Sequence, residues 1–247
     1  MHLNKKNIII FLGPSLSTDE ASKILDADYR PPIQRGDVTV ALQDNPDIIG
    51  IIDGVFHQQP AVSHREILNA LKKGVTIVGG ASMGALRAAE LDDFGMVGIG
   101  YVYNQYKNGF IESDDDVAII INPLNLEQLS DSLVSMEYNF KRMLDKGIIS
   151  EEEFNRLFKT AKSIFYPKRT YDLVFNSVDI DKVCETPKSE GFGAQNEVLQ
   201  ATFRNSEKPC FSQAKIKELE KFLDEEGIDI KRQDAIDVIK YIKSMID

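Results

Sequence analysis

Short runs of mainly apolar residues are the clearest pattern in the first hundred residues of the chain. Three of them stand out, at residues 7–13, 49–53 and 75–78. Such runs are typical of strands that are buried on both faces of a sheet. Helical patterns alternate with them, over residues 17–25, 38–43, 64–71 and 83–91. Strands separated by helices pair in parallel, so we expect an α/β fold with a layered, mostly parallel sheet and flanking helices.

The pattern changes after about residue 122, where apolar residues begin to recur every three or four positions. This spacing is typical of amphipathic helices. Four are expected, with apolar faces at Leu126–Met143, Phe154–Ile164, Ile216–Leu223 and Ile236–Ile246. Proline and glycine predict loops at residues 29–37 and 187–193. The sequence therefore predicts an α/β domain over residues 1–121, followed by a helical region over residues 122–247.

The composition is that of an ordinary globular protein, and it argues against several classes of function. Of 247 residues, 43% are hydrophobic and 28% are charged. The 29 basic residues are outnumbered by 39 acidic ones, so the cationic face that nucleic-acid binding needs is not expected. Two cysteines and three histidines suit neither a disulfide framework nor a metal centre. No apolar stretch is long enough for a bilayer or a signal peptide, so we expect a cytoplasmic protein.

The segment Gly80–Gly84 carries the sharpest chemical signal, the sequence G-A-S-M-G between an expected strand and an expected helix. In that context G-x-S-x-G is a nucleophile elbow, which holds the serine in a strained turn at the carboxyl edge of a sheet. Ser82 is then the candidate nucleophile, and the amides of Met83 and Gly84 are candidate oxyanion donors at the helix N-terminus. A tight turn of small residues, or a serine that only binds an anion, has the same sequence pattern.

A serine nucleophile needs a base, and candidates follow the second expected strand. His64 begins the next helix, where it is a candidate base or simply a capping residue. Arg65 stays charged and cannot accept a proton, but it can pair with an anion. Asp53 and Gly54 end the strand, so they can orient a base, bind a ligand group or form a turn, and His57 follows them.

Two further loops have polar chemistry. Gly13 to Ser15 end the first expected strand, and their backbone amides can supply a second oxyanion donor or hold a terminal carboxylate. No G-K-[ST] follows, which excludes a nucleotide-hydrolysing P-loop. The acidic run Glu112–Asp116 is a solvated loop, a metal site or a docking patch for a basic partner.

Taken together and in order, these short motifs resemble the TfuA-like core family. The matching segments are Gly13–Leu16, Arg30–Pro32, Gly36–Asp37, Ile52–Gly54 with Phe56, Pro60–Val62, His64–Leu68, Ser82–Leu91, Phe94–Met96 with Gly98, Asp115–Ala118, Leu129–Ser130 and Phe165–Tyr171. The resemblance is close over roughly residues 7–120 and looser beyond them, and no motif after about residue 180 can be assigned.

The resemblance implies a role in peptide-backbone thioamidation beside a YcaO enzyme, which activates the backbone amide with ATP. A TfuA-like protein is expected to hydrolyse the thiocarboxylated C-terminus of a ThiS-like sulfur carrier with a Ser–Lys pair and no cofactor, releasing sulfide. It is also expected to help YcaO hold its peptide or protein substrate. A non-catalytic activator of YcaO, and a small-molecule esterase or amidase that uses the same elbow, are the alternatives.

One position departs from the family pattern. The family commonly has lysine after the histidine of the segment that is His64–Leu68 here, and this chain has Arg65 at that position. If that lysine is the family's base, then His64 or another lysine such as Lys168 must replace it, or Arg65 only stabilises negative charge.

Overall fold

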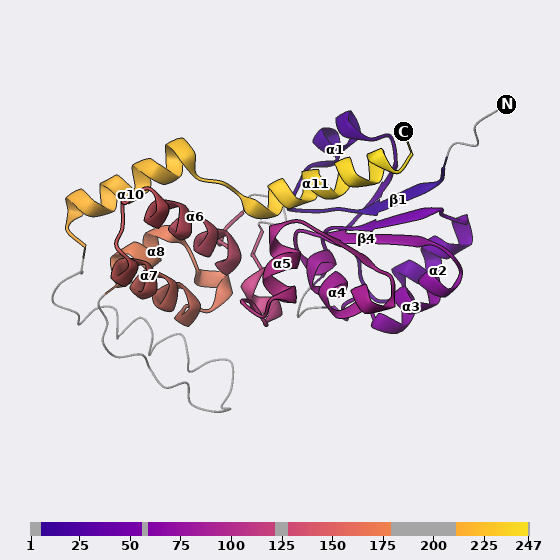
Figure 1. Cartoon of the computed structure of the whole chain (residues 1–247), viewed down its shortest axis with the longest axis horizontal. Coiled ribbons are helices and arrows are strands. Elements are labelled where there is room, and N and C mark those ends of the chain that lie inside the picture. The colour runs from indigo at the N-terminus through magenta and orange to yellow at the C-terminus, as the bar shows by residue number, and fades with distance from the viewer. Residues whose placement is uncertain (1–5, 56–58, 122–127, 179–210, 247) are drawn as a thin grey trace. The chain divides into compact units, whose positions relative to one another are not determined.

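The computed structural model describes residues 6–55, 59–121, 128–178 and 211–246. The chain divides into two compact units (Figure 1). The α/β unit combines Met1–Gln128 with Asp229–Asp247, and the helical unit is Leu129–Ile228. This division differs from the expected boundary after residue 121, because the last helix returns to the sheet. Two distant parts of the sequence therefore build the α/β unit.

Five parallel strands form the sheet, in the order β2-β1-β3-β4-β5, which confirms the expected α/β fold. Their bounds are β1 (Ile8–Phe11), β2 (Asp28–Arg30), β3 (Ile48–Ile51), β4 (Thr76–Gly80) and β5 (Val97–Ile99). The strands β1, β3 and β4 correspond to the three apolar runs. The two edge strands were not predicted, and the expectation of a loop at residues 29–37 was wrong at its start. Each edge strand has only three residues, and none of those residues is fully buried.

Helices cover both faces of this sheet. Their bounds are α1 (Thr18–Ile24), α2 (Asp37–Ala41), α3 (His64–Lys72), α4 (Met83–Leu91), α5 (Tyr101–Lys107) and α11 (Ile230–Ser244), with short 3-10 turns η1 (Leu42–Asp44), η2 (Asp92–Phe94) and η3 (Asp114–Asp116). Figure 1 shows α1 and α11 on one side of the sheet, and α2, α3 and α4 on the other. Alternate strand residues divide accordingly: Ile9 and Phe11 belong to one apolar core, and Ile8 and Ile10 to the other.

Helix α11 crosses the sheet on a buried stripe that the sequence predicts only in part. Of the expected apolar face, Ile239 and Ile242 are buried, but Ile246 is exposed. The buried face also includes Val238, which was not predicted. A Cβ added to Gly80, at the end of β4, would lie 2.5 Å from Val238, so glycine lets α11 approach the strand closely. The N-terminal turns of α11 are thereby carried toward the carboxyl edge of the sheet.

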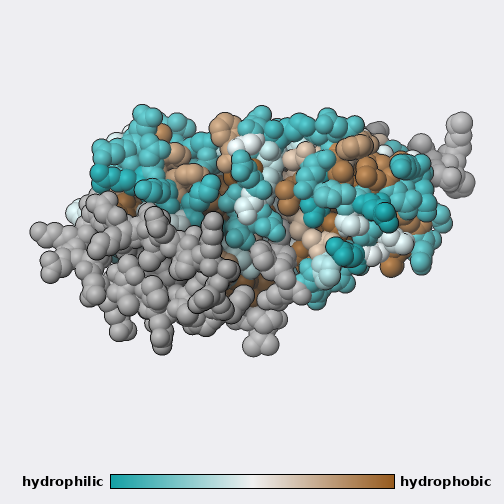
Figure 2. Space-filling model, turned by 90° about the horizontal axis from the view of Figure 1, so that it is seen from below, coloured by the Kyte–Doolittle hydropathy of each residue, from teal (hydrophilic) through white to brown (hydrophobic). Residues whose placement is uncertain are grey.

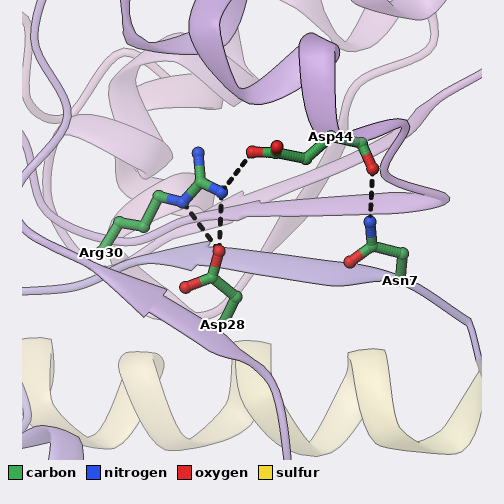
Figure 3. A network of polar contacts seen from close by, with 4 residues as sticks. All are labelled: Asn7, Asp28, Arg30 and Asp44. Atoms are coloured by element: carbon green, nitrogen blue, oxygen red, sulfur yellow. Dashed lines mark hydrogen bonds and ion pairs between the residues drawn. The ribbon is translucent and has the colours of Figure 1, made fainter.

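The edge strand β2 is fastened by a polar network at the side of the sheet (Figure 3). The Arg30 guanidinium contacts the carboxylates of Asp28, at 2.6 Å, and Asp44, at 2.7 Å. The side-chain amide of Asn7 donates to the Asp44 carbonyl. The network joins β2, η1 and the residue before β1, so it explains how a short, polar strand keeps its place.

The helical unit consists, among its described residues, of α6 (Leu133–Asp145), α7 (Glu151–Ser163), η4 (Tyr166–Lys168), α8 (Tyr171–Ser177) and α10 (Gln213–Glu226). Helix α6 begins later than expected, because Ser132 caps it. Helix α8 was not predicted, and the expected loop at 187–193 lies outside the described residues. Aromatic rings pack in the core of the unit, with Phe140 edge-on to Tyr171. No helix in the described ranges is long and apolar enough to span a membrane.

Candidate functional site

The carboxyl ends of β1 and β3 define the place where a ligand is expected. The strand order reverses between these two neighbours, and open α/β sheets bind ligands outside the strands at such a switch point. The segments that follow β1, β3 and β4 meet there. The Gly84 amide donates to the Ile52 carbonyl at 3.2 Å, and a Cβ added to Gly54 would lie 2.6 Å from the Met83 Cγ. The start of α4 is therefore packed against the end of β3.

The turn before α4 is a sharp elbow, as the sequence predicts, but its strain lies one residue earlier than expected. Ala81 has a φ of 65°, a conformation that costs energy for any residue with a Cβ. The Ser82 amide donates to the Gly80 carbonyl at 2.8 Å, which closes a γ-turn around Ala81. Ser82 itself has a φ of −133°, so the strained position is Ala81.

Ser82 stands at the N-cap of α4 and is only 2% exposed. Its side chain makes no capping hydrogen bond, and among the described residues none hydrogen-bonds to its hydroxyl. The hydroxyl is therefore not committed to holding the helix. Met83 supplies the first amide of α4, a position that has no acceptor within the helix. The Gly84 amide, by contrast, is used by the Ile52 carbonyl, so it is not directed at a ligand.

Asp53 organises the loop after β1. Its carboxylate is 1% exposed and accepts hydrogen bonds from the Gly13 amide at 2.9 Å, the Ser15 amide at 3.0 Å and the Ser15 hydroxyl at 2.6 Å. The amides of this loop were expected to face an oxyanion or a terminal carboxylate of a substrate. In the structure, the carboxylate that they hold is the chain's own.

Lys231, in the first turn of α11, is a buried charged residue that the sequence analysis missed. It is 4% exposed, and its Nζ donates to the Val117 carbonyl at 2.8 Å. Burial lowers the pKa of Lys231, while the negative charges of Asp53 and Asp229 act in the opposite direction. Asp53 is thus near enough to influence the ammonium group, which brings Lys231 to the same edge of the sheet.

A sequence signal for Lys231 does exist. Along α11, Lys231, Asp234, Val238 and Ile242 recur at helical spacing, and all four are buried. A charged residue inside an otherwise buried stripe marks a site or a structural ion pair. The signal becomes readable only when the correct face of the helix is known.

His64 and Arg65 are not brought to Ser82. The His64 Nε2 lies 2.7 Å from the Glu90 Oε2, and Glu90 also pairs with Arg87 at 2.6 Å. Glu90 is near the C-terminal end of α4, whereas Ser82 is at its N-terminus. Each residue advances the helix by about 1.5 Å along its axis, so the contact with Glu90 holds His64 away from Ser82. Arg65 is exposed and, within the described ranges, has no hydrogen bond or ion pair.

Two other candidates lie elsewhere. Lys168, the alternative base, belongs to the helical unit, in η4. His57 lies outside the described residues.

The acidic run Glu112–Asp116 has a local structural role. The Asp116 carboxylate accepts from the amides of Glu112 and Ser113 and completes a capping box for η3. Among the described residues, no group of three or more acidic, histidine or cysteine side chains could hold a metal ion.

Over the part of the chain that the structure describes, the surface gives no further indication of a site. The face in Figure 2 is mixed over the α/β unit, where hydrophobic residues interrupt a mainly hydrophilic surface. Val40, Phe94 and Phe110 are exposed but come from different elements, and singly exposed apolar residues are normal.

An elbow serine, a loop held by an aspartate and a buried lysine lie at the carboxyl edge of the parallel sheet. The chain is therefore an α/β protein with a polar candidate site at that edge. The sequence model of the family described as TfuA-like protein matches residues 53–170. This segment is a little under half of the chain and includes Ser82, and its match confirms the resemblance to the TfuA-like family that is seen in the sequence. The family suggests a role in thioamidation together with YcaO. No curated protein matches the chain.

Proposed function

We propose that this protein hydrolyses the thiocarboxylated C-terminus of a ThiS-like carrier protein, with Ser82 as nucleophile and Lys231 as general base. The sulfide that is released would pass to a partner YcaO, which thioamidates a peptide backbone. The observation that carries the proposal is the gathering of an uncommitted elbow serine and a buried lysine at one edge of the sheet. The match of residues 53–170 to the TfuA-like family supports the thioamidation role.

The buried lysine suits the role of the base. A neutral amine can accept the Ser82 proton, and burial lowers the pKa of Lys231 so that more of it is neutral near neutral pH. The hydrogen bond from Nζ to the Val117 carbonyl fixes the end of this flexible side chain. Arg65 and His64 then have no part in proton transfer, and lysine at position 65 is not required.

The reaction is a two-step acyl transfer. The Ser82 Oγ attacks the thiocarboxylate carbon, a C–O bond forms, the C–S bond breaks and sulfide leaves. The Met83 amide, at the positive end of α4, stabilises the oxyanion. Water then attacks the ester carbon, the bond between that carbon and the Ser82 Oγ breaks, and Oγ receives a proton from the water, whose oxygen stays in the carboxylate of the carrier.

Sulfide release from a ThiS-type thiocarboxylate tests this proposal. Ser82→Ala and Lys231→Met should each lose at least about a hundredfold in rate, as expected for loss of a nucleophile or a general base. Arg65→Lys and His64→Gln are matched controls on α3 and should retain the wild-type rate. Folding of every variant is checked by circular dichroism. Release that survives in a folded Ser82→Ala variant would contradict the proposal.

A second candidate function is supported by the burial of Ser82, which is only 2% exposed. In this alternative the protein binds YcaO and raises its affinity for the peptide substrate without catalysis. The two roles, sulfide release and activation of YcaO, can coexist, and thioamidation assays with inorganic sulfide separate them. If wild-type protein still stimulates YcaO when sulfide is supplied, and Ser82→Ala does so equally, activation is independent of the serine. If the wild-type protein releases no more sulfide than buffer alone, activation of YcaO is the candidate function that is retained.

A further inference from the structure

Asp53 is more completely engaged by the protein than a ligand-binding carboxylate would be. One oxygen, Oδ2, accepts from the amides of Gly13 and Ser15, and the other, Oδ1, accepts from the Ser15 hydroxyl. The side chain is 1% exposed. All three donors come from the loop after β1, whereas Asp53 follows β3, so the contacts join the two strands on either side of the switch point.

The geometry leaves little freedom in this loop. A Cβ added to Gly13 would lie 2.4 Å from Pro32 Cγ and 3.5 Å from the Asp53 Cβ. The backbone therefore passes close to Asp53, and only a residue without a side chain fits there. Asp53 is thus a mechanical link between the loop after β1 and the end of β3.

Among the described residues, two negative charges act on Lys231. Asp53, after β3, and Asp229, at the N-cap of α11, both favour its protonated form. The segment that contacts it from the side of η3 presents the Val117 carbonyl. The neighbouring charges are directed elsewhere. Arg232 pairs with Glu20 on α1, and Asp234 accepts from the first turn of α5.

We infer that Asp53 is a positioning residue of this site: its carboxylate holds the Gly13–Ser15 loop against β3 and supplies the negative charge that faces Lys231. This inference rests on the proposed function, in which Lys231 is the base. Asp53 makes no contact with the reacting atoms. It acts through the shape of the loop and through the protonation of the lysine.

Asp53→Asn separates these two effects. The asparagine oxygen can accept from both amides, as Oδ2 does, and its NH₂ group can donate to the Ser15 oxygen after the hydroxyl rotates. The variant therefore keeps the three contacts and loses the charge. Ser15→Ala is the matched variant, because it removes one contact and keeps the charge.

The first measurement is a titration of the Lys231 Nζ by ¹⁵N NMR, assigned by comparison with Lys231→Met. The pKa of Lys231 should fall by about one unit or more in Asp53→Asn, because an opposite charge nearby is lost. It should stay within about half a unit of the wild-type value in Ser15→Ala, since the charge is retained.

The second measurement is the pH dependence of sulfide release. Its acid limb should move to lower pH in Asp53→Asn by the same amount as the lysine pKa. An unchanged lysine pKa in Asp53→Asn, or an equal shift in Ser15→Ala, would overturn the inference. If Lys231→Met still releases sulfide, the proposed base is wrong, whereas the NMR titration continues to test Asp53 by itself.

Discussion

Asp234 gives the most quantitative prediction. Its carboxylate is 1% exposed and accepts from the amides of Tyr101 at 2.8 Å and Val102 at 2.7 Å, thereby capping α5 from a distant helix. Gly100, the N-cap residue, has a φ of 98°, and an added Cβ would lie 2.3 Å from the Asp234 Cγ. Burial is the main cause that raises the pKa of Asp234 from 3.8 to about 7, and the two amides only partly oppose it.

The sign of the resulting pH dependence follows from proton binding. Between the two pKa values the native state holds the Asp234 proton more tightly than the unfolded state does, so stability falls as the pH rises. The stabilisation is fully present below the unfolded-state pKa and is lost as the pH rises through about 7. A shift of this size corresponds to about 4 kcal/mol in total, of which about 3 kcal/mol falls between pH 5 and pH 8.

Urea unfolding followed by far-ultraviolet circular dichroism at pH 5 and pH 8 measures this effect. Asp234→Asn cannot ionise, so it should lack the fall, and its stability relative to wild type should rise by about 3 kcal/mol between the two pH values. Asp224→Asn, on the exposed side of α10, is the control for loss of one carboxylate and should follow wild type. A difference between Asp234→Asn and wild type that is the same at both pH values would refute the argument.

Two further predictions concern the packing of the sheet. Gly84→Ala places a Cβ 1.7 Å from the Ile51 carbonyl oxygen, so it should lower the free energy of unfolding by about 3 kcal/mol or prevent folding. Gly74→Ala has open space around it and should lower the free energy of unfolding by only about 1 kcal/mol. Thermal unfolding measures both variants, and equal losses of stability would contradict the close approach of α4. Arg30→Ala removes two exposed ion pairs and should lower the free energy of unfolding by about 1 kcal/mol or less. Relative to wild type, hydrogen exchange should become faster in β2 by more than it does in β4. Unchanged exchange in β2 would show that the network does not hold the edge strand.

Local sequence was sufficient for the central strands and for the elbow. The strands β1, β3 and β4 are apolar runs because neighbours and helices bury them, and G-x-S-x-G marks the turn before α4. The edge strand β2 could not be predicted, because its stability comes from Arg30 and its partners rather than from apolar residues. Lys231 was missed for a related reason. Its neighbours are assembled by tertiary packing, and nothing near it in the sequence indicates Asp53 or Val117.

The return of α11 to the sheet has a consequence for the order in which the protein can be made. On a ribosome, the strands emerge first, and the helix that covers Ile10 and Ile48 emerges only after the whole helical unit has been synthesised. Until then one apolar face of the nascent sheet is open to solvent, and the polar site lacks its lysine. Contacts between such distant segments also slow folding. The site is therefore completed late in folding. The intermediate in which α11 does not yet cover the sheet is the form most prone to aggregate and to bind chaperones.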